Sequence, residues 1–249
     1  MISRREELIR LIDDKFEKKI SQRRYHSNGV KFVIFDSFLV KCTINIEKEE
    51  LSTEIDLGFR NIIAEFQGMP FVSGLKESEI IVCLNQVEAC CHTHLLDKFL
   101  IAKGWKDGAS GNKLREKNYE IWQKEHSDFI EFKRNNRNDV GFVKNWAFDF
   151  IHAAKSFFGN RISGIEITKI EESHPRENAF YLKFRMYDYF DMTGGGGTSL
   201  GWEIRKGEYF IDLPTSQHWF GLAHFDEFFK DMQEELELRL PDDYLKKNA

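Results

Sequence analysis

The 249-residue sequence has few of the residues that mark special structural classes. Its four prolines give no Pro-rich linker, and its four cysteines are too few for a disulfide scaffold. Cys90 and Cys91 are adjacent and are therefore poor disulfide partners for each other. We expect no disulfide, no structural zinc ion and a reducing compartment.

The sequence also lacks a long apolar run and an excess of basic residues. No stretch reaches the length of a membrane span, and residues 1–19 are charged throughout, without the apolar region of a signal peptide. The net charge is −5, from 36 basic and 41 acidic residues, which argues against binding to a phosphate backbone. We therefore expect no membrane span and no nucleic-acid partner. We expect the chain to be cytoplasmic as synthesised, with export by a dedicated secretion system as the alternative.

Phenylalanine, in contrast, is abundant. The chain has 23 copies, and each can bury a large apolar surface, so a substantial core is expected. Hydrophobic residues make up 41% and charged residues 31%, a balance typical of a globular protein rather than a disordered one. We expect a single α+β domain over residues 1–249, with a soft boundary near 135–139 as its only suggested division. No internal sequence repeat is visible.

The first half of the chain is predicted to be mainly helical. Ser3 and Glu6 form a capping box before apolar residues that recur every four positions. Residues 30–46 predict two strands or one bent strand. Ser52 or Thr53 would then cap a helix, and further helices are expected at about 77–102, 114–132 and 139–158. The segment 79–84 is also compatible with a strand, because short apolar runs are ambiguous.

In the second half the hydrophobic period changes to two. Phe180, Leu182, Phe184 and Met186 alternate with polar or amphipathic residues. This pattern predicts an antiparallel β meander over about 162–213 with one apolar face, on which a C-terminal helix at 225–240 packs. The fold class is therefore predicted to be α+β, with a helical N-terminal half and a β-rich C-terminal half.

Four consecutive glycines at 194–197 are the only low-complexity feature. Glycine-rich backbone can cradle phosphate, but no Gly-Lys-Ser or Gly-Lys-Thr follows here. We interpret the segment as the flexible loop of a hairpin.

Two aspartates and one histidine are the candidate catalytic residues. Asp188 and Asp191 flank two aromatic residues near the end of an expected strand. If both face one pocket, they suit general acid/base chemistry or the binding of a divalent cation. The alternative is backbone hydrogen bonding in a turn. His218 follows the meander and could supply a base or a ligand at the mouth of the same sheet.

A second candidate cluster is Cys90 and His94, which share one face of the expected helix. They could supply two metal ligands, whereas a closed zinc site needs four, and no second pair with suitable spacing exists. Buried thiols beside hydrogen-bonded histidines are the alternative interpretation.

Segments 186–191 (Met-Tyr-Asp-Tyr-Phe-Asp) and 207–214 (Gly-Glu-Tyr-Phe-Ile-Asp-Leu-Pro) resemble the C-terminal β-rich region of colicin M-type toxin domains and of some interbacterial effectors. The resemblance implies metal-assisted cleavage of a phosphodiester in the lipid-linked peptidoglycan precursor, with Asp188 and Asp191 in the places of the family's two aspartates. Phe190 stands where the family has tyrosine, and residues 192–197 lack its His-Arg pair.

Two hypotheses follow, and the sequence leaves both open. The first is an effector or toxin-type hydrolase with Asp188, Asp191 and His218 around a shared concave site and a divalent cation as a possible cofactor. The second is a non-catalytic acidic binding module, an immunity or scaffold protein that acts through a protein partner and presents an exposed apolar or acidic patch.

Overall fold

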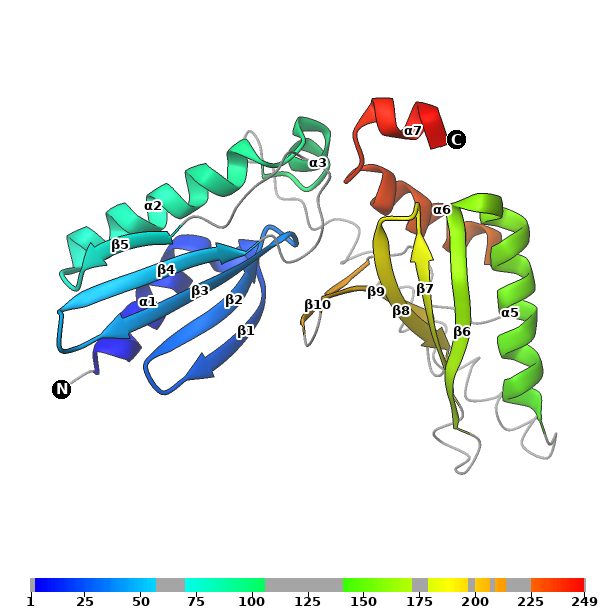
Figure 1. Ribbon diagram of the computed structural model, residues 1–249, viewed down its shortest axis with the longest axis horizontal. Helices are drawn as coiled ribbons and strands as arrows, with labels where there is room; N and C mark the ends of the chain where they lie inside the picture. Colours follow the sequence, from blue (N-terminus) through cyan, green and yellow to red (C-terminus); the bar gives the residue numbers. More distant parts are fainter. Residues whose placement is uncertain are drawn as a thin grey trace. The chain divides into compact units, whose positions relative to one another are not determined.

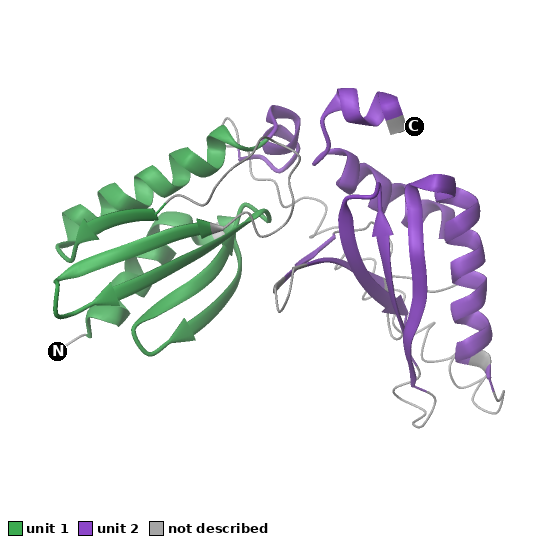
Figure 2. Ribbon diagram, in the orientation of Figure 1, with its two compact units in different colours: residues 1–95 green, residues 96–249 purple. Residues whose placement is uncertain are grey.

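The computed structural model describes residues 3–56, 70–105, 141–171, 179–196, 200–206, 209–213 and 225–248. The chain forms two compact units, Met1–Leu95 and Leu96–Ala249 (Figure 2). The soft boundary expected near 135–139 lies outside the described residues. No helix in the described part of the chain is long and apolar enough to cross a membrane.

Unit 1 is an antiparallel five-stranded sheet with a helix before it and a helix after it (Figure 1). Its strands follow one another in the order β1-β2-β3-β4-β5. Ser3 caps the first helix as predicted: its hydroxyl accepts a hydrogen bond from the Glu6 N–H, and the Glu6 carboxylate accepts one from the Ser3 N–H. The elements of unit 1 are α1 (Arg4–Phe16), the 3₁₀ helix η1 (Glu17–Lys19), β1 (Ile20–His26), β2 (Gly29–Ile34), β3 (Phe38–Asn45), β4 (Glu50–Asp56), β5 (Pro70–Gly74) and α2 (Glu77–Thr93).

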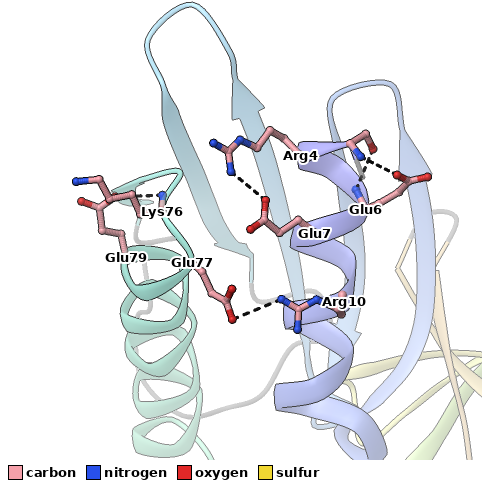
Figure 3. Close-up of polar contacts among 8 residues, drawn as sticks. Arg4, Glu6, Glu7, Arg10, Lys76, Glu77 and Glu79 are labelled. Atoms are coloured by element: carbon pink, nitrogen blue, oxygen red, sulfur yellow. Dashed lines mark hydrogen bonds and ion pairs between the residues drawn. The ribbon is translucent and has the colours of Figure 1, made fainter. Parts of the chain in front are cut away.

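Helices α1 and α2 lie side by side on one face of this sheet (Figure 3). An ion pair between Arg10 of α1 and Glu77 of α2, at 3.4 Å, joins the two helices. At the far end of α2, Glu88 accepts hydrogen bonds from Lys15 at 2.7 Å and Lys19 at 2.5 Å. These contacts fix the rotation of α2 about its own axis.

The prediction of a mainly helical N-terminal half is wrong. Ser52 and Thr53, the expected caps of a helix, lie instead within strand β4, in which Leu51, Thr53 and Ile55 are buried and alternate with more exposed neighbours. This alternation with a period of two is the physical reason for a strand, because every second side chain then lies on the sheet face that the helices cover. The remainder of that helix and the helix expected at 114–132 lie outside the described residues.

The helix expected at 77–102 is divided into α2 and a short helix α3 (Asp97–Ala102), with a break at residues 94–96. The alternative of a strand at 79–84 is wrong, because Ile80, Cys83, Leu84 and Val87 form the buried stripe of α2.

Unit 2 contains α3 and a second antiparallel five-stranded sheet in the order β10-β9-β8-β7-β6. The predicted meander is confirmed, and so is the packing of the C-terminal helix: Phe180, Leu182 and Phe184 are buried, and the Phe228 ring lies 5.9 Å from the Trp202 ring. The remaining elements are α5 (Phe142–Phe158), η2 (Gly159–Arg161), β6 (Ile162–Glu171), β7 (Ala179–Met186), β8 (Phe190–Gly196), β9 (Leu200–Lys206), β10 (Tyr209–Asp212), α6 (Phe225–Glu237) and α7 (Asp242–Asn248).

The two units repeat one architecture, although the sequence shows no repeat. Within the described residues, each contains a helix, a 3₁₀ turn, a five-stranded antiparallel meander and a second helix on the same face as the first, and unit 2 contains α3 and α7 in addition. The helices that follow the sheets bury apolar residues with identical spacing: Ile80, Cys83, Leu84, Val87 and Cys91 in α2, and Phe225, Phe228, Phe229, Met232 and Leu236 in α6, which buries Glu235 in addition. The repeat was invisible in the sequence because packing conserves the burial pattern and not the residue types.

Over its described part, residues 194–196, the glycine segment is a strand and not the expected hairpin loop. Gly194, Gly195 and Gly196 lie in β8, paired with both β7 and β9. A Cβ atom on Gly194 would lie 2.1 Å from the Trp202 ring, and one on Gly196 would lie 2.6 Å from the Phe180 ring and 2.7 Å from the Trp146 ring. These glycines therefore make room for large aromatic side chains of the core.

We predict that Gly194→Ala lowers the free energy of unfolding by about 1–3 kcal/mol, because the new methyl group displaces a buried tryptophan ring. Gly201→Ala is the matched control in the neighbouring strand, since its Cβ would meet nothing within 4 Å. Urea unfolding of both variants tests this. Equal stability of the two variants would contradict the role assigned to Gly194.

Candidate functional site

A polar network lies at the hairpin between β7 and β8, residues 187–189, which we term the hairpin tip. The Tyr189 N–H donates to the Met186 carbonyl at 2.9 Å. Tyr187 and Asp188 have φ angles of 53° and 52°. Two successive residues with positive φ define a type I′ turn, which matches the twist of the flanking strands. A bulky residue such as tyrosine rarely adopts this conformation.

Three hydrogen bonds hold the tip in place through one residue. The Tyr187 N–H donates to the Arg161 carbonyl at 2.7 Å, and the Tyr244 hydroxyl donates to the Tyr187 carbonyl at 2.5 Å. The Tyr187 hydroxyl donates to the Glu237 carboxylate at 2.6 Å. The tip is therefore fixed to η2, to α6 and to α7.

Glu237 is the centre of a small polar network beneath the tip. Its carboxylate also accepts a hydrogen bond from Gln233 at 2.7 Å and lies 3.9 Å from the Arg161 guanidinium. Burial of Tyr187, together with its hydrogen bond to Glu237 and the negative charge of that carboxylate, raises the pKa of the Tyr187 hydroxyl well above its ordinary value of 10. The hydroxyl thus stays protonated and donates throughout the physiological range.

Asp188 and Asp191, the two aspartates that the sequence offered for one pocket, are both exposed. Asp191 lies on β8, opposite Arg185 on β7, and its Oδ1 atom accepts hydrogen bonds from Arg185 Nε at 2.9 Å and Nη2 at 2.7 Å. Asp188 lies at the tip, and burial and the charge of Asp188 together raise the pKa of the Tyr244 hydroxyl. Asp188 is thus exposed in the turn, whereas Asp191 is exposed on β8 and paired with Arg185.

Of the other candidate residues, His218 lies outside the described residues, and Cys90 and His94 belong to unit 1. The His94 ring is hydrogen-bonded through Nδ1 to the backbone carbonyl of Cys90 at 2.7 Å. All four cysteines are free thiols, and burial raises the pKa of the Cys91 thiol well above its ordinary value. Across the described ranges, no group of three or more His, Cys, Asp or Glu side chains is placed to hold a metal ion.

Sequence reasoning named Tyr187 but missed its partners Arg161, Glu237 and Tyr244. Glu237 and Tyr244 are 50 and 57 positions along the chain from Tyr187. No local motif joins these residues. The one available signal was the apolar stripe of the C-terminal helix, which places Glu237 next to the buried Leu236.

Comparison with protein-family models, with curated proteins and with solved structures gave no match.

We predict that Tyr187→Phe lowers the free energy of unfolding by about 1–3 kcal/mol at pH 8, because Glu237 loses a buried donor. The folded-state pKa of Tyr187 is raised, so its contribution is complete below pH 10 and decreases as the pH rises beyond that value. The difference between wild type and variant should therefore narrow by roughly 1 kcal/mol at pH 11. Urea unfolding at both pH values measures this, and a pH-independent difference would contradict the assignment.

We predict that Asp188→Gly raises the free energy of unfolding by about 0.5–1 kcal/mol, because glycine adopts a positive φ without a steric cost. Asp188→Ala is the comparison, since alanine retains the strain and should give no gain. If the glycine variant is less stable than wild type, the Asp188 side chain itself stabilises the turn.

Proposed function

We propose that the protein is a non-catalytic binding module, of the immunity or scaffold type, which recognises a protein partner through the hairpin tip of unit 2. One observation carries the proposal. Asp188 is exposed on a turn whose backbone is fixed by three hydrogen bonds through Tyr187. A rigid, exposed acidic and aromatic turn loses little conformational entropy when a partner binds.

The corresponding turn of unit 1 provides an internal comparison. Phe35 and Asp36 have φ angles of 55° and 46°, so both units contain the same rare turn. In unit 1 the turn is covered: Phe35 and Ser37 are fully buried, and Asp36 is 9% exposed. In unit 2 the position equivalent to Ser37 is Tyr189, which is partly exposed, and Asp188 is exposed. The turn itself does not require an exposed aspartate, because Asp36 is buried in the same turn of unit 1. The exposure of Asp188 therefore supports a recognition role for the turn of unit 2.

The hydrolase hypothesis finds less support in the geometry. Metal-assisted cleavage would require the carboxylates of Asp188 and Asp191 to share one divalent cation. The Asp191 Oδ1 atom already accepts two hydrogen bonds from Arg185, so a cation at this carboxylate would lie beside a guanidinium of like charge. We therefore propose that Asp191 stabilises the sheet through Arg185 and that Asp188 contacts the partner. Because Asp188 carries a negative charge, the partner's surface should be basic.

The experiment is to capture the partner on the wild-type protein from its source cells, identify it by mass spectrometry and measure its affinity after purification. Asp188→Asn removes the charge and preserves the turn, since asparagine tolerates positive φ. This variant should weaken binding by about tenfold or more. Glu166→Gln is the matched control, because Glu166 is an exposed carboxylate of the same sheet that pairs with Lys183. It should leave affinity within about twofold.

Equal affinities of wild type and Asp188→Asn for the partner would show that the hairpin tip is not part of the interface. Hydrolysis of a phosphodiester by the purified protein with added Mg²⁺, Mn²⁺ or Zn²⁺, if abolished by Asp188→Asn, would refute the non-catalytic assignment and restore the hydrolase hypothesis.

A further inference from the structure

Three cations lie in a line across the sheet of unit 1, on the face opposite to α1 and α2. Strands β1 to β4 are neighbours in this sheet (Figure 1). Arg24 of β1 is directly opposite Lys31 of β2, and Lys31 is directly opposite Lys41 of β3. Lys41 in turn lies opposite Glu54 of β4 and forms an ion pair with it at 3.4 Å. We term these four residues the cationic row. Neighbouring strands are about 4.8 Å apart, so the row presents one charge per strand.

The order of charges in the row opposes folding. Like charges that lie directly opposite one another destabilise an antiparallel pair, and the row contains two such pairs in succession. Lys31 lies between the two other cations, and its side chain makes no hydrogen bond or ion pair with any residue that the structure describes. The side chains of Lys41 and Glu54 are 44% and 57% exposed, so solvent reaches the row. A local conflict of this kind, without a structural gain, is typical of a functional surface.

The repeated architecture supplies an internal control for this surface. Counted from the shared turn, Lys31 corresponds to Lys183 of unit 2, and the strand pairings extend the equivalence across the sheet. The equivalent row of unit 2 consists of Glu166, Lys183, Thr193 and Glu203. There the cation has a carboxylate directly opposite, and Lys183 forms an ion pair with Glu166 at 2.8 Å. The fold therefore does not require adjacent cations at this position.

We propose that the cationic row binds an acidic segment of a partner protein, rich in aspartate and glutamate, with the carboxylates of that segment over Lys31 and its two cationic neighbours. The surface belongs to unit 1, so the proposal goes beyond the recognition role of the hairpin tip and does not depend on it. A carboxylate between two neighbouring cations offsets their mutual repulsion and accepts charge-assisted hydrogen bonds from both. Binding thus supplies the counter-charge that the row lacks in the free protein.

The surroundings of the row favour a protein over a nucleic acid. Strand β4 carries two exposed carboxylates on this face, Glu50 and Glu54. A phosphate backbone is uniformly negative and would be repelled there, whereas a protein segment can place a basic side chain beside them. On the described strands of the sheet, this face carries no phenylalanine, tyrosine or tryptophan on which a base could stack. The charge pattern is therefore complementary to a segment of mixed but mainly acidic composition.

The first test measures binding of a fluorescently labelled poly-L-glutamate peptide of about 20 residues to the full chain by fluorescence anisotropy. At neutral pH and low salt the wild type should bind it with a Kd on the order of 10–500 µM, and added salt should weaken the binding. Lys31→Glu should weaken binding by about tenfold or more. Lys183→Glu, at the equivalent position of unit 2, changes the net charge equally and is the matched control. It should leave the affinity within about twofold of the wild type.

A second measurement separates a binding role from a structural one. Lys31→Glu places a carboxylate between Arg24 and Lys41, so the variant should unfold at a higher urea concentration than the wild type even though it loses binding. Lys183→Glu should have the opposite effect on stability, because it places two carboxylates opposite each other at Glu166. The two variants therefore differ in the sign of their effect on stability as well as in affinity.

Four results would overturn the proposal. The first is a wild-type chain that does not bind poly-L-glutamate, and the second is equal affinity of Lys31→Glu and Lys183→Glu for it. The third is a lower urea midpoint for Lys31→Glu than for the wild type, which would show that Lys31 serves the fold. The fourth is tighter binding of an oligothymidylate of the same length at the same salt concentration, which would show that the row recognises phosphate.

Discussion

One backbone hydrogen bond organises each unit. The aromatic residue of the central hairpin donates its N–H to the last carbonyl of the 3₁₀ turn: Phe35 to Lys19 at 2.8 Å and Tyr187 to Arg161 at 2.7 Å. The bond ties the end of the first helix to the middle of the sheet. It also helps to hold a bulky residue at positive φ, a conformation that costs on the order of 1–3 kcal/mol unless the surroundings impose it. The helix position, the sheet register and the direction of the hairpin all depend on this point.

The two units solve the same packing problem with different side chains. In unit 1 the turn residue Phe35 lies edge-on to His92 of α2, with ring centroids 4.8 Å apart. In unit 2 the corresponding pair is Tyr187 and Glu237, joined by a hydrogen bond at 2.6 Å. A ring contact and a polar contact thus perform the same structural task. Differences between the units therefore say most about function where they occur on the surface, because core packing does not determine those residues. Two such differences are the exposed tip of unit 2 and the cationic row of unit 1.

Local patterns predicted those parts of the fold in which one period dominates. The capping box at Ser3, the alternation at 180–186 and the stripe at 225–240 led to the correct elements because burial on one face selects a single period. A helix was predicted to begin at Ser52 or Thr53 because Ile55 fits both a helical stripe and a strand, and only its pairing with Val40 decides between them. The glycines at 194–196 were misjudged because their role depends on Trp146, Phe180 and Trp202, which no local pattern connects to them. The sequence pointed to residues 187–191 but not to the side chains that hold this hairpin, since those come from three distant elements, η2, α6 and α7.

The most direct test of this account is amide hydrogen exchange resolved for individual residues by NMR. If the hairpin tip is a rigid surface fixed by its backbone, the N–H groups of Tyr187 and Phe35 should be among the slowly exchanging amides of the chain, with protection comparable to the central strands. Exchange of the Tyr187 amide at the rate of an unstructured loop would contradict the account, because a mobile tip could be neither the structural centre of unit 2 nor a preformed recognition surface.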